Sequence, residues 1–107
     1  MRVLIDESLP VELAEELPGV DVATVHAKRW LQLRNGVLLR AAVAEGFTVI
    51  LTADHNLQYQ QNLPKIGIGA VVVTGIRNRI EELRPMIPRI IAALREVKPG
   101  EVIELTR

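Results

Sequence analysis

The stretch Val49-Ile50-Leu51-Thr52, followed by Ala53-Asp54-His55-Asn56, decides the fold. Four β-branched or leucine residues bounded by polar ones are typical of a strand buried on both faces of a parallel sheet. Arg2-Val3-Leu4-Ile5 has the same character and also runs into acids, Asp6-Glu7. In an open α/β sheet, sites form in the crevice beyond the carboxyl ends of the strands. The two segments therefore predict a parallel sheet and one place where their acids meet.

Extended and helical patterns alternate along the rest of the chain. We expect strands at residues 2–5, 20–25, 48–52, 70–74 and 102–105, with helices at 8–17, 35–46, 56–63 and 80–97. This alternation predicts a single α/β domain over residues 1–107, with three α/β/α layers and a mainly parallel sheet of about five strands. Its crossovers are expected to be right-handed. The last strand is expected at an edge of the sheet.

Several residues predict where the helices begin and end. Leucine recurs every four residues from Leu9 to Leu17, which indicates an amphipathic first helix. Asn35 is expected to cap the next helix. Pro64 is expected to end the short helix that follows the acidic turn, and Pro85 and Pro88 are expected to kink or split the last one.

The composition excludes several classes of protein. The chain has 107 residues, of which 49% are hydrophobic, a proportion that suits a globular domain and argues against disorder. It has no cysteine, which excludes disulfides and thiolate metal sites. The apolar run in residues 1–10 is too short for a signal peptide, and no stretch approaches the length of a membrane span. We therefore expect a cytoplasmic protein with no membrane partner.

The formal net charge is zero, but the charges are segregated along the chain. The segment 22–43 carries basic residues and no acid, whereas the first helix is acidic. The residues concerned are Lys28, Arg29, Arg34 and Arg40 on one side and Glu12, Glu15 and Glu16 on the other. A basic surface beside an acidic pocket suits an enzyme that handles phosphodiesters. Solvated helix faces explain any single one of these charges equally well.

The acids at the two strand ends point to a site. Carboxylates gathered there repel one another, so a shared proton or a hard cation with oxygen ligands must offset the repulsion. Asn56 could give a neutral oxygen to such a cation or cap the following helix. The alternative for Asp6 is a helix cap, a role that Ser8 could also fill. Capping explains one strand-end acid comfortably but explains the second, Asp54, less well.

The other candidate side chains carry weaker signals. His26 and His55 are expected at the surface, and neither pairs with a second ligand at the spacing of a zinc site. Trp30 lies among basic residues and could stack on a nucleobase, but anchoring its loop to the core is the favoured role for a sole tryptophan. A phosphorylation-receiver domain is disfavoured, because the fourth and fifth predicted strands do not end on a lysine.

Four segments together resemble a known family. They read M-R-V-L-I-D-E-S-L-P at the start, W-x-x-L-R-N-G-x-L-L in the middle, T-A-D-x-N-L-x-Y-Q-Q-N-L after the third strand and K-P-G-E-V near the end. In these segments the chain resembles the small PIN-like proteins of the DUF5615 group. Those proteins are similar to PilT N-terminus nucleases and to the toxin halves of bacterial toxin–antitoxin pairs. The resemblance covers nearly the whole chain.

The resemblance implies a metal-dependent ribonuclease fold that holds Mg²⁺ or Mn²⁺ with acids at strand and helix ends. Asp6 matches the first acid and Asp54 a later one, and Asn56 takes the place of a further polar ligand. Many relatives have an aspartate where this chain has Asn35. With less negative charge than a two-metal site usually carries, one weakly held Mg²⁺ that keeps several waters is the better expectation.

Two functions follow from this resemblance. The first is an RNA-cleaving enzyme, in the role of a toxin controlled by a small antitoxin protein. In that function the residues divide into a catalytic set, a metal set, a pair that contacts substrate phosphates and a supporting pair. They are Asp6, Asp54 and Asn56 for catalysis; Asp6, Asp54 and Asn35 for the metal; Arg77 and Arg79 for the substrate; and Glu7 and Ser8 in support.

The second function is a PIN-like binding module that has lost catalysis and acts through a protein partner. Asn35 favours this alternative, whereas the pair of strand-end aspartates favours the enzyme. A homodimer is compatible with either function, and the sequence locates no interface for it.

Overall fold

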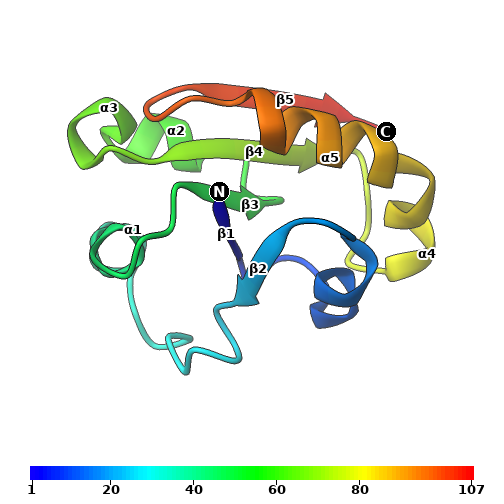
Figure 1. The fold of residues 1–107 in the computed structure, drawn as a ribbon, viewed down its shortest axis with the longest axis horizontal. Coiled ribbons are helices and arrows are strands. Elements are labelled where there is room, and N and C mark those ends of the chain that lie inside the picture. Colours follow the sequence, from blue (N-terminus) through cyan, green and yellow to red (C-terminus); the bar gives the residue numbers. More distant parts are fainter.

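A computed structural model describes residues 1–107 and contains one five-stranded sheet in which all strands run parallel (Figure 1). The strand order is β2-β1-β3-β4-β5. The strands are β1 (Arg2–Ile5), β2 (Asp21–Thr24), β3 (Val49–Thr52), β4 (Gly69–Thr74) and β5 (Val102–Thr106). The predicted α/β class and parallel five-stranded sheet are confirmed, and β5 lies at an edge as expected.

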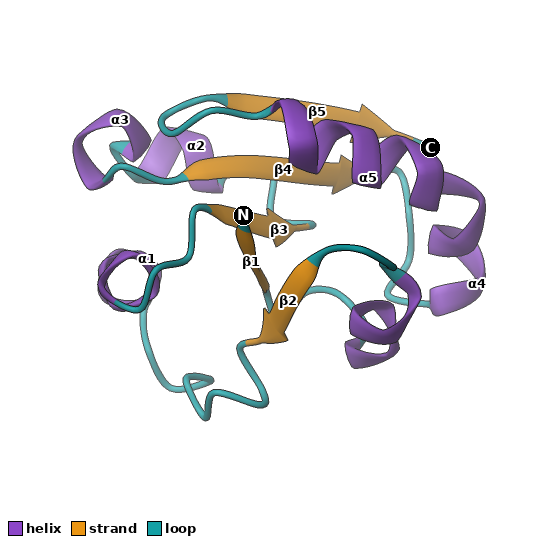
Figure 2. Cartoon of the chain, in the orientation of Figure 1, coloured by secondary structure: helices purple, strands orange, loops and turns teal.

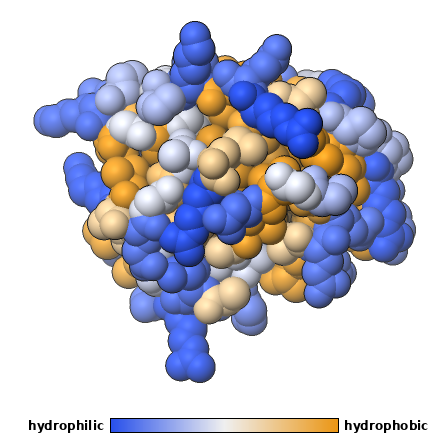
Figure 3. Space-filling model, in the orientation of Figure 1, coloured by the Kyte–Doolittle hydropathy of each residue, from blue (hydrophilic) through white to orange (hydrophobic).

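Helices fill the connections and cover both faces of the sheet, which gives three layers (Figure 2). They are η1 (Val11–Glu16), α1 (Asn35–Ala44), α2 (Leu57–Gln60), α3 (Leu63–Ile66), α4 (Ile80–Leu83), η2 (Arg84–Met86) and α5 (Ile87–Glu96). No helix has both the length and the apolar content needed to cross a bilayer. On the face drawn in Figure 3, hydrophilic residues surround and separate the apolar ones that reach the surface.

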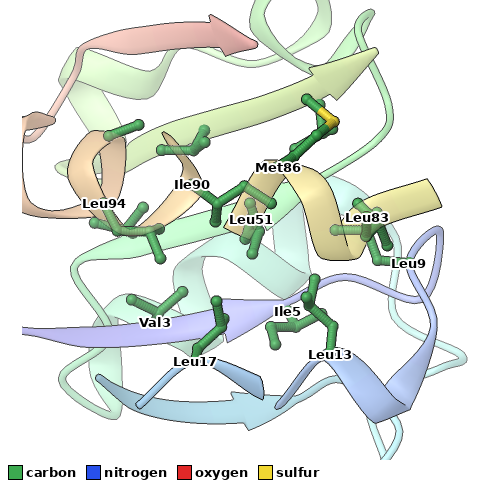
Figure 4. Close-up of a cluster of buried hydrophobic side chains, with 14 of the residues drawn as sticks. Val3, Ile5, Leu9, Leu13, Leu17, Leu51, Leu83, Met86, Ile90 and Leu94 are labelled. Atoms are coloured by element: carbon green, nitrogen blue, oxygen red, sulfur yellow. The ribbon is translucent and has the colours of Figure 1, made fainter. Parts of the chain in front are cut away.

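The first face of the sheet packs against η1, α4, η2 and α5 (Figure 4). Val3, Ile5 and Leu51 from the central strands are at most 1% exposed there. The three regularly spaced leucines from Leu9 to Leu17 are buried in the same cluster, so the predicted amphipathic pattern is confirmed. The helix itself is shorter than predicted and is a 3₁₀ helix. Pro10 and Pro18 flank η1 and limit its length, and its six residues form a 3₁₀ helix that is longer than most.

The second face packs against α1, α2, α3 and the loop that precedes α1. Trp30 belongs to this loop and meets Phe47 edge to face, with ring centroids 6.2 Å apart and planes at 71°. Its ring is partly buried against the cluster that contains Leu4 and Ile50. The expectation that Trp30 anchors its loop to the core is therefore confirmed.

One crossover departs from the expected handedness. The chain steps from β1 to β2 and from β4 to β5 in opposite directions along the sheet, yet η1 and α4–α5 lie on the same face. From β3 to β4 it steps in the same direction as from β4 to β5, but α2 and α3 lie on the opposite face. The β4–β5 crossover therefore has the opposite hand to the other two, and α5 lies in front of β4 and β5 in Figure 1. The expectation of uniformly right-handed crossovers is wrong here. The six residues of η1 leave most of the first face uncovered, and the apolar side of α4–α5 completes it.

Two of the expected helix ends, at Asn35 and at Pro64, need correction. Asn35 is the first residue of α1, and the extended Arg34 occupies the N-cap without a side-chain cap, so the predicted Asn35 cap is wrong. Pro64 lies inside the first turn of α3 instead of ending a helix, because Asn62 Oδ1 accepts a hydrogen bond from Lys65 N at 3.1 Å and caps a new helix there. Pro85 and Pro88 split the last segment as expected, into α4, η2 and α5.

Candidate functional site

The candidate site lies beyond the carboxyl ends of β1 and β3, the two central neighbours in the sheet. These strands pair in parallel, with Ile5 opposite Leu51. The chain leaves β1 towards β2 on one side and leaves β3 towards β4 on the other. The strand order therefore reverses between β1 and β3, and such a switch point leaves a crevice in which α/β proteins bind ligands.

A cluster of hydroxyls holds the carboxylate of Asp6 in this crevice. Its Oδ2 accepts hydrogen bonds from Ser8 Oγ at 2.8 Å and from Thr52 Oγ1 at 2.9 Å. The two hydroxyl oxygens lie 3.2 Å apart. Ser8 comes from the turn after β1 and Thr52 is the last residue of β3, so the Asp6 carboxylate joins the two strands.

The same hydroxyls also accept hydrogen bonds from the backbone of the turn after β3. Ala53 N donates to Ser8 Oγ and Asp54 N donates to Thr52 Oγ1, each at 3.0 Å. Thr52 is only 1% exposed, so water cannot substitute freely for these partners. With both donors and acceptors occupied, the hydroxyls have a fixed orientation and fix that of the Asp6 carboxylate.

Asp54 is connected to Asp6 through two successive hydrogen bonds, both made by Thr52 Oγ1. Its side chain stabilises the turn that follows β3. Its Oδ1 accepts a hydrogen bond from Asn56 N at 3.0 Å, and its backbone N–H is held by Thr52. One carboxylate oxygen of each aspartate, Oδ1 of Asp6 and Oδ2 of Asp54, accepts no hydrogen bond from the chain. These two oxygens are the atoms that a cation or a substrate could use.

The remaining predicted residues lie at different distances from this network. Ser8 is central to it, whereas Glu7 is exposed and Asn56 precedes α2 with its side chain unbonded. Asn35 opens α1, and its side chain makes no hydrogen bond to either aspartate. No three histidine, aspartate or glutamate side chains gather closely enough to hold a metal ion. The hydroxyl cluster therefore binds the Asp6 carboxylate and the Asp54 backbone N–H, and Asn35 forms no hydrogen bond with it.

The two predicted substrate residues lie on the same edge of the sheet. Arg77 and Arg79 follow the carboxyl end of β4, the strand next to β3, and both are exposed. The Arg77 backbone N–H donates to Glu82 Oε1 at 3.2 Å, which orients the loop. Neither guanidinium takes part in an ion pair within the chain, so both positive charges face solvent.

A cavity of about 190 Å³ adjoins Asp6 between the ends of β1 and β2. Its polar lining includes Asp6 and Glu7, which follow β1, Thr24, the last residue of β2, and His26 from the turn after β2. Thr24 is buried, and its Oγ1 accepts a hydrogen bond from Ala27 N at 2.9 Å. The sequence predicts His26 only as an incidental surface residue and gives Thr24 no role. Their place at the end of the second predicted strand is the signal that points to both, since that end lies beside the carboxyl end of the first strand.

The fold and the site together define a class: a three-layer α/β/α protein with a carboxylate and hydroxyl cluster at the switch point of a parallel sheet. Comparison with protein-family models, curated proteins and solved structures finds no match. The residues of the site are therefore the basis for its function.

Proposed function

We propose that this chain is a PIN-like protein that binds one Mg²⁺ or Mn²⁺ between Asp6 and Asp54 and cleaves RNA. The observation that carries the proposal is the fixed Asp6 carboxylate at the switch point. Hydroxyls from both central strands hold one of its oxygens and leave the other available near the turn of Asp54.

The donor set suits a single hard cation. Mg²⁺ prefers oxygen ligands and is commonly bound by one or two carboxylates, with waters and substrate phosphates completing its shell. The free oxygens of Asp6 and Asp54 supply two such ligands. The Ser8 and Thr52 hydroxyls orient Asp6 instead of serving as further ligands, in the way that outer partners commonly position metal-binding side chains. Two carboxylates do not suit a two-metal centre.

Each chain residue has a separate task in this proposal. A bound Mg²⁺ polarises a phosphate oxygen and lowers the pKa of a bound water. Ser8 and Thr52 keep the Asp6 carboxylate in one orientation, so little side-chain freedom is lost when the ligands assemble. Arg77 and Arg79 bind phosphates that flank the reacting one, which positions the strand without reading its sequence.

The small number of acids favours a second candidate, a binding module that has lost catalysis. With Asp6 and Asp54 as the only strand-end aspartates and an asparagine at position 35, the same edge could bind RNA or an antitoxin-type protein without cleaving a bond. The arginines after β4 would then supply the binding, and the acids would not be needed for it.

Cleavage of a labelled RNA oligonucleotide distinguishes the two candidates. The enzyme is expected to cut with Mg²⁺ or Mn²⁺, to stop with a chelator, and to lose activity in Asp6→Asn and Asp54→Asn. The matched control is Asp21→Asn, because the Asp21 side chain is 70% exposed at the amino-terminal start of β2, at the opposite end of the strands. Full RNA binding with no cleavage under any metal would support the binding module.

The toxin role is tested separately in cells. Induced expression of the wild-type chain is expected to arrest growth, and expression of Asp54→Asn at the same level is expected not to. Equal growth of both strains would contradict the toxin role and leave the metal site to be judged on its own.

A further inference from the structure

The two edges of the sheet differ in how much of their backbone is left open. At the β2 edge, the Thr24 carbonyl already accepts a hydrogen bond from Lys28 N at 3.0 Å, so the following loop folds back over that strand. At the β5 edge no segment lies beyond the strand, as the upper border of the sheet in Figure 1 shows. The β5 edge is therefore the more open one.

The backbone groups that β5 exposes can be identified from its pairing with β4. Ala70 N donates to Glu101 O at 2.9 Å, and Arg107 N donates to Thr74 O at 3.1 Å. The backbone groups of Glu101 and Arg107, just beyond the two ends of β5, therefore point towards β4. Successive residues of a strand alternate in direction. The N–H and C=O groups of Val102, Glu104 and Thr106 therefore point away from the sheet. None of the backbone hydrogen bonds outside the regular elements involves these three residues.

This edge lacks several of the features that usually block further pairing, although it keeps one charged side chain, Glu104, at its centre. Natural edge strands are commonly protected by lysine, proline or a β-bulge. The five residues of β5 include neither lysine nor proline, and their register with β4 runs without a bulge from Val102 to Thr106.

We propose that β5 pairs antiparallel with β5 of a second copy of this chain, about a two-fold axis at Glu104, and joins the two sheets into one. On this axis Glu104 faces itself, and Val102 faces Thr106 of the second copy. All three outward residues then gain backbone partners. An axis at Ile103 would instead set Thr106 against Gly100, whose N–H is already bonded to Ile68 O at 3.0 Å. The axis at Glu104 is therefore the favoured register.

Side chains also support this register. It sets Ile103 against Leu105 of the second copy, on the face where both are partly buried beside α5. It also sets Glu101 against Arg107 of the second copy. Glu101 lines a hollow of about 520 Å³ at the start of β5, together with Glu96 and Lys98, and an arginine side chain can enter there.

Two charges in the single chain oppose or compete with this pairing. Arg107 forms an ion pair with Glu82, whose side chain is 16% exposed, so Arg107 must leave a partly buried carboxylate in order to pair with Glu101 of the second copy. The two Glu104 carboxylates face each other and repel. The dimer is therefore expected to be weak and dependent on concentration. In this dimer the strands of the two copies run in opposite directions, so the carboxyl edges of the two sheets point away from each other. The proposed dimer is therefore independent of the Asp6 site and of the function proposed for that site.

Sedimentation equilibrium tests the dimer, with protein concentrations up to the order of 0.5 mM because small interfaces are transient. The wild type is expected to dimerise, and Glu104→Gln to dimerise about 2- to 5-fold more tightly because the facing charges are gone. Glu104→Pro is expected to be monomeric with an unchanged circular dichroism spectrum, since an outward N–H on an edge strand can be replaced by proline. A monomeric wild type across the whole range, or a dimeric Glu104→Pro, would overturn the proposal.

Cysteine cross-linking tests the register, and the natural chain contains no cysteine to interfere. Residues 103 and 105 face each other as a pair without direct hydrogen bonds, with Cα atoms about 4.5 Å apart, a spacing that a disulfide can bridge. Oxidation of a mixture of Ile103→Cys and Leu105→Cys is expected to give the mixed disulfide dimer. Neither variant alone should cross-link efficiently. A disulfide dimer of Ile103→Cys alone, or none in the mixture, would overturn the register at Glu104.

Discussion

Replacement of Thr52 by valine removes one hydroxyl from the centre of the site and keeps the shape of the side chain. The change deletes the hydrogen bond to Asp6 Oδ2 at 2.9 Å and the acceptor for Asp54 N at 3.0 Å. A hydrogen bond to a charged group contributes about 1.5–3 kcal/mol, and a neutral one about 1 kcal/mol. Because half-buried Asp54 can still reach water, we expect a total loss of about 2–3 kcal/mol. For a chain of this length that corresponds to a fall in Tm of about 8–24 °C.

Urea and thermal unfolding measure this loss against a matched control. Thr48→Val makes the same chemical change at an exposed position, where the hydroxyl has only one long hydrogen bond, to Arg2 O at 3.4 Å. The control is expected to change the free energy of unfolding by no more than about 0.5 kcal/mol. If Thr52→Val unfolds at the same urea concentration as Thr48→Val, the hydroxyl cluster does not hold the two strand ends together, and the reasoning for a fixed Asp6 fails.

Four further predictions concern the site and the core. Ser8→Ala is expected to lower the free energy of unfolding, measured in urea, by about 1–3 kcal/mol, because both Asp6 Oδ2 and Ala53 N lose their hydrogen bond to Ser8 Oγ. Asp54→Asn keeps an acceptor for Asn56 N, so equilibrium dialysis should show a more than 10-fold loss of Mg²⁺ affinity with an unchanged Tm; a large fall in Tm would point to a structural role. Asn35→Asp should leave that affinity unchanged, and tighter binding would place residue 35 inside the site. Leu13→Ala should cost about 2–5 kcal/mol, because this leucine of η1 is fully buried in the core cluster.

The central strands were predictable because a strand buried in a parallel sheet is a continuous run of apolar or β-branched residues in the sequence. Val49–Thr52 and Gly69–Thr74 are runs of apolar or β-branched residues in which each residue but one is buried. Such runs are recognisable in any tertiary context, and their alternation with helical segments predicts the parallel direction, whereas the order of the strands within the sheet was not predicted. The link between Asp6 and the turn of Asp54 through Thr52 is consistent with the same pattern, because carboxyl ends of neighbouring parallel strands share one edge.

The features that were missed depend on which elements meet in space. A threonine at the end of a strand is ordinary in sequence, and Thr52 gains its role only when β1 brings Asp6 and Ser8 against it. The apolar side of α4–α5 is visible in the sequence, but the pattern does not say which face of the sheet it covers. The unusual hand of the β4–β5 crossover therefore could not be predicted.

Binding of Mn²⁺ to the wild-type chain, followed by paramagnetic line broadening of backbone amides, tests the central claim most directly. It requires neither a substrate nor catalytic turnover. We expect the amides of Asp6, Ser8, Ala53 and Asp54 to broaden first, the effect to disappear in Asp6→Asn, and Asp21→Asn to behave like the wild type. Broadening centred on another part of the chain, or broadening at these amides that persists in Asp6→Asn, would contradict a metal site between the ends of β1 and β3.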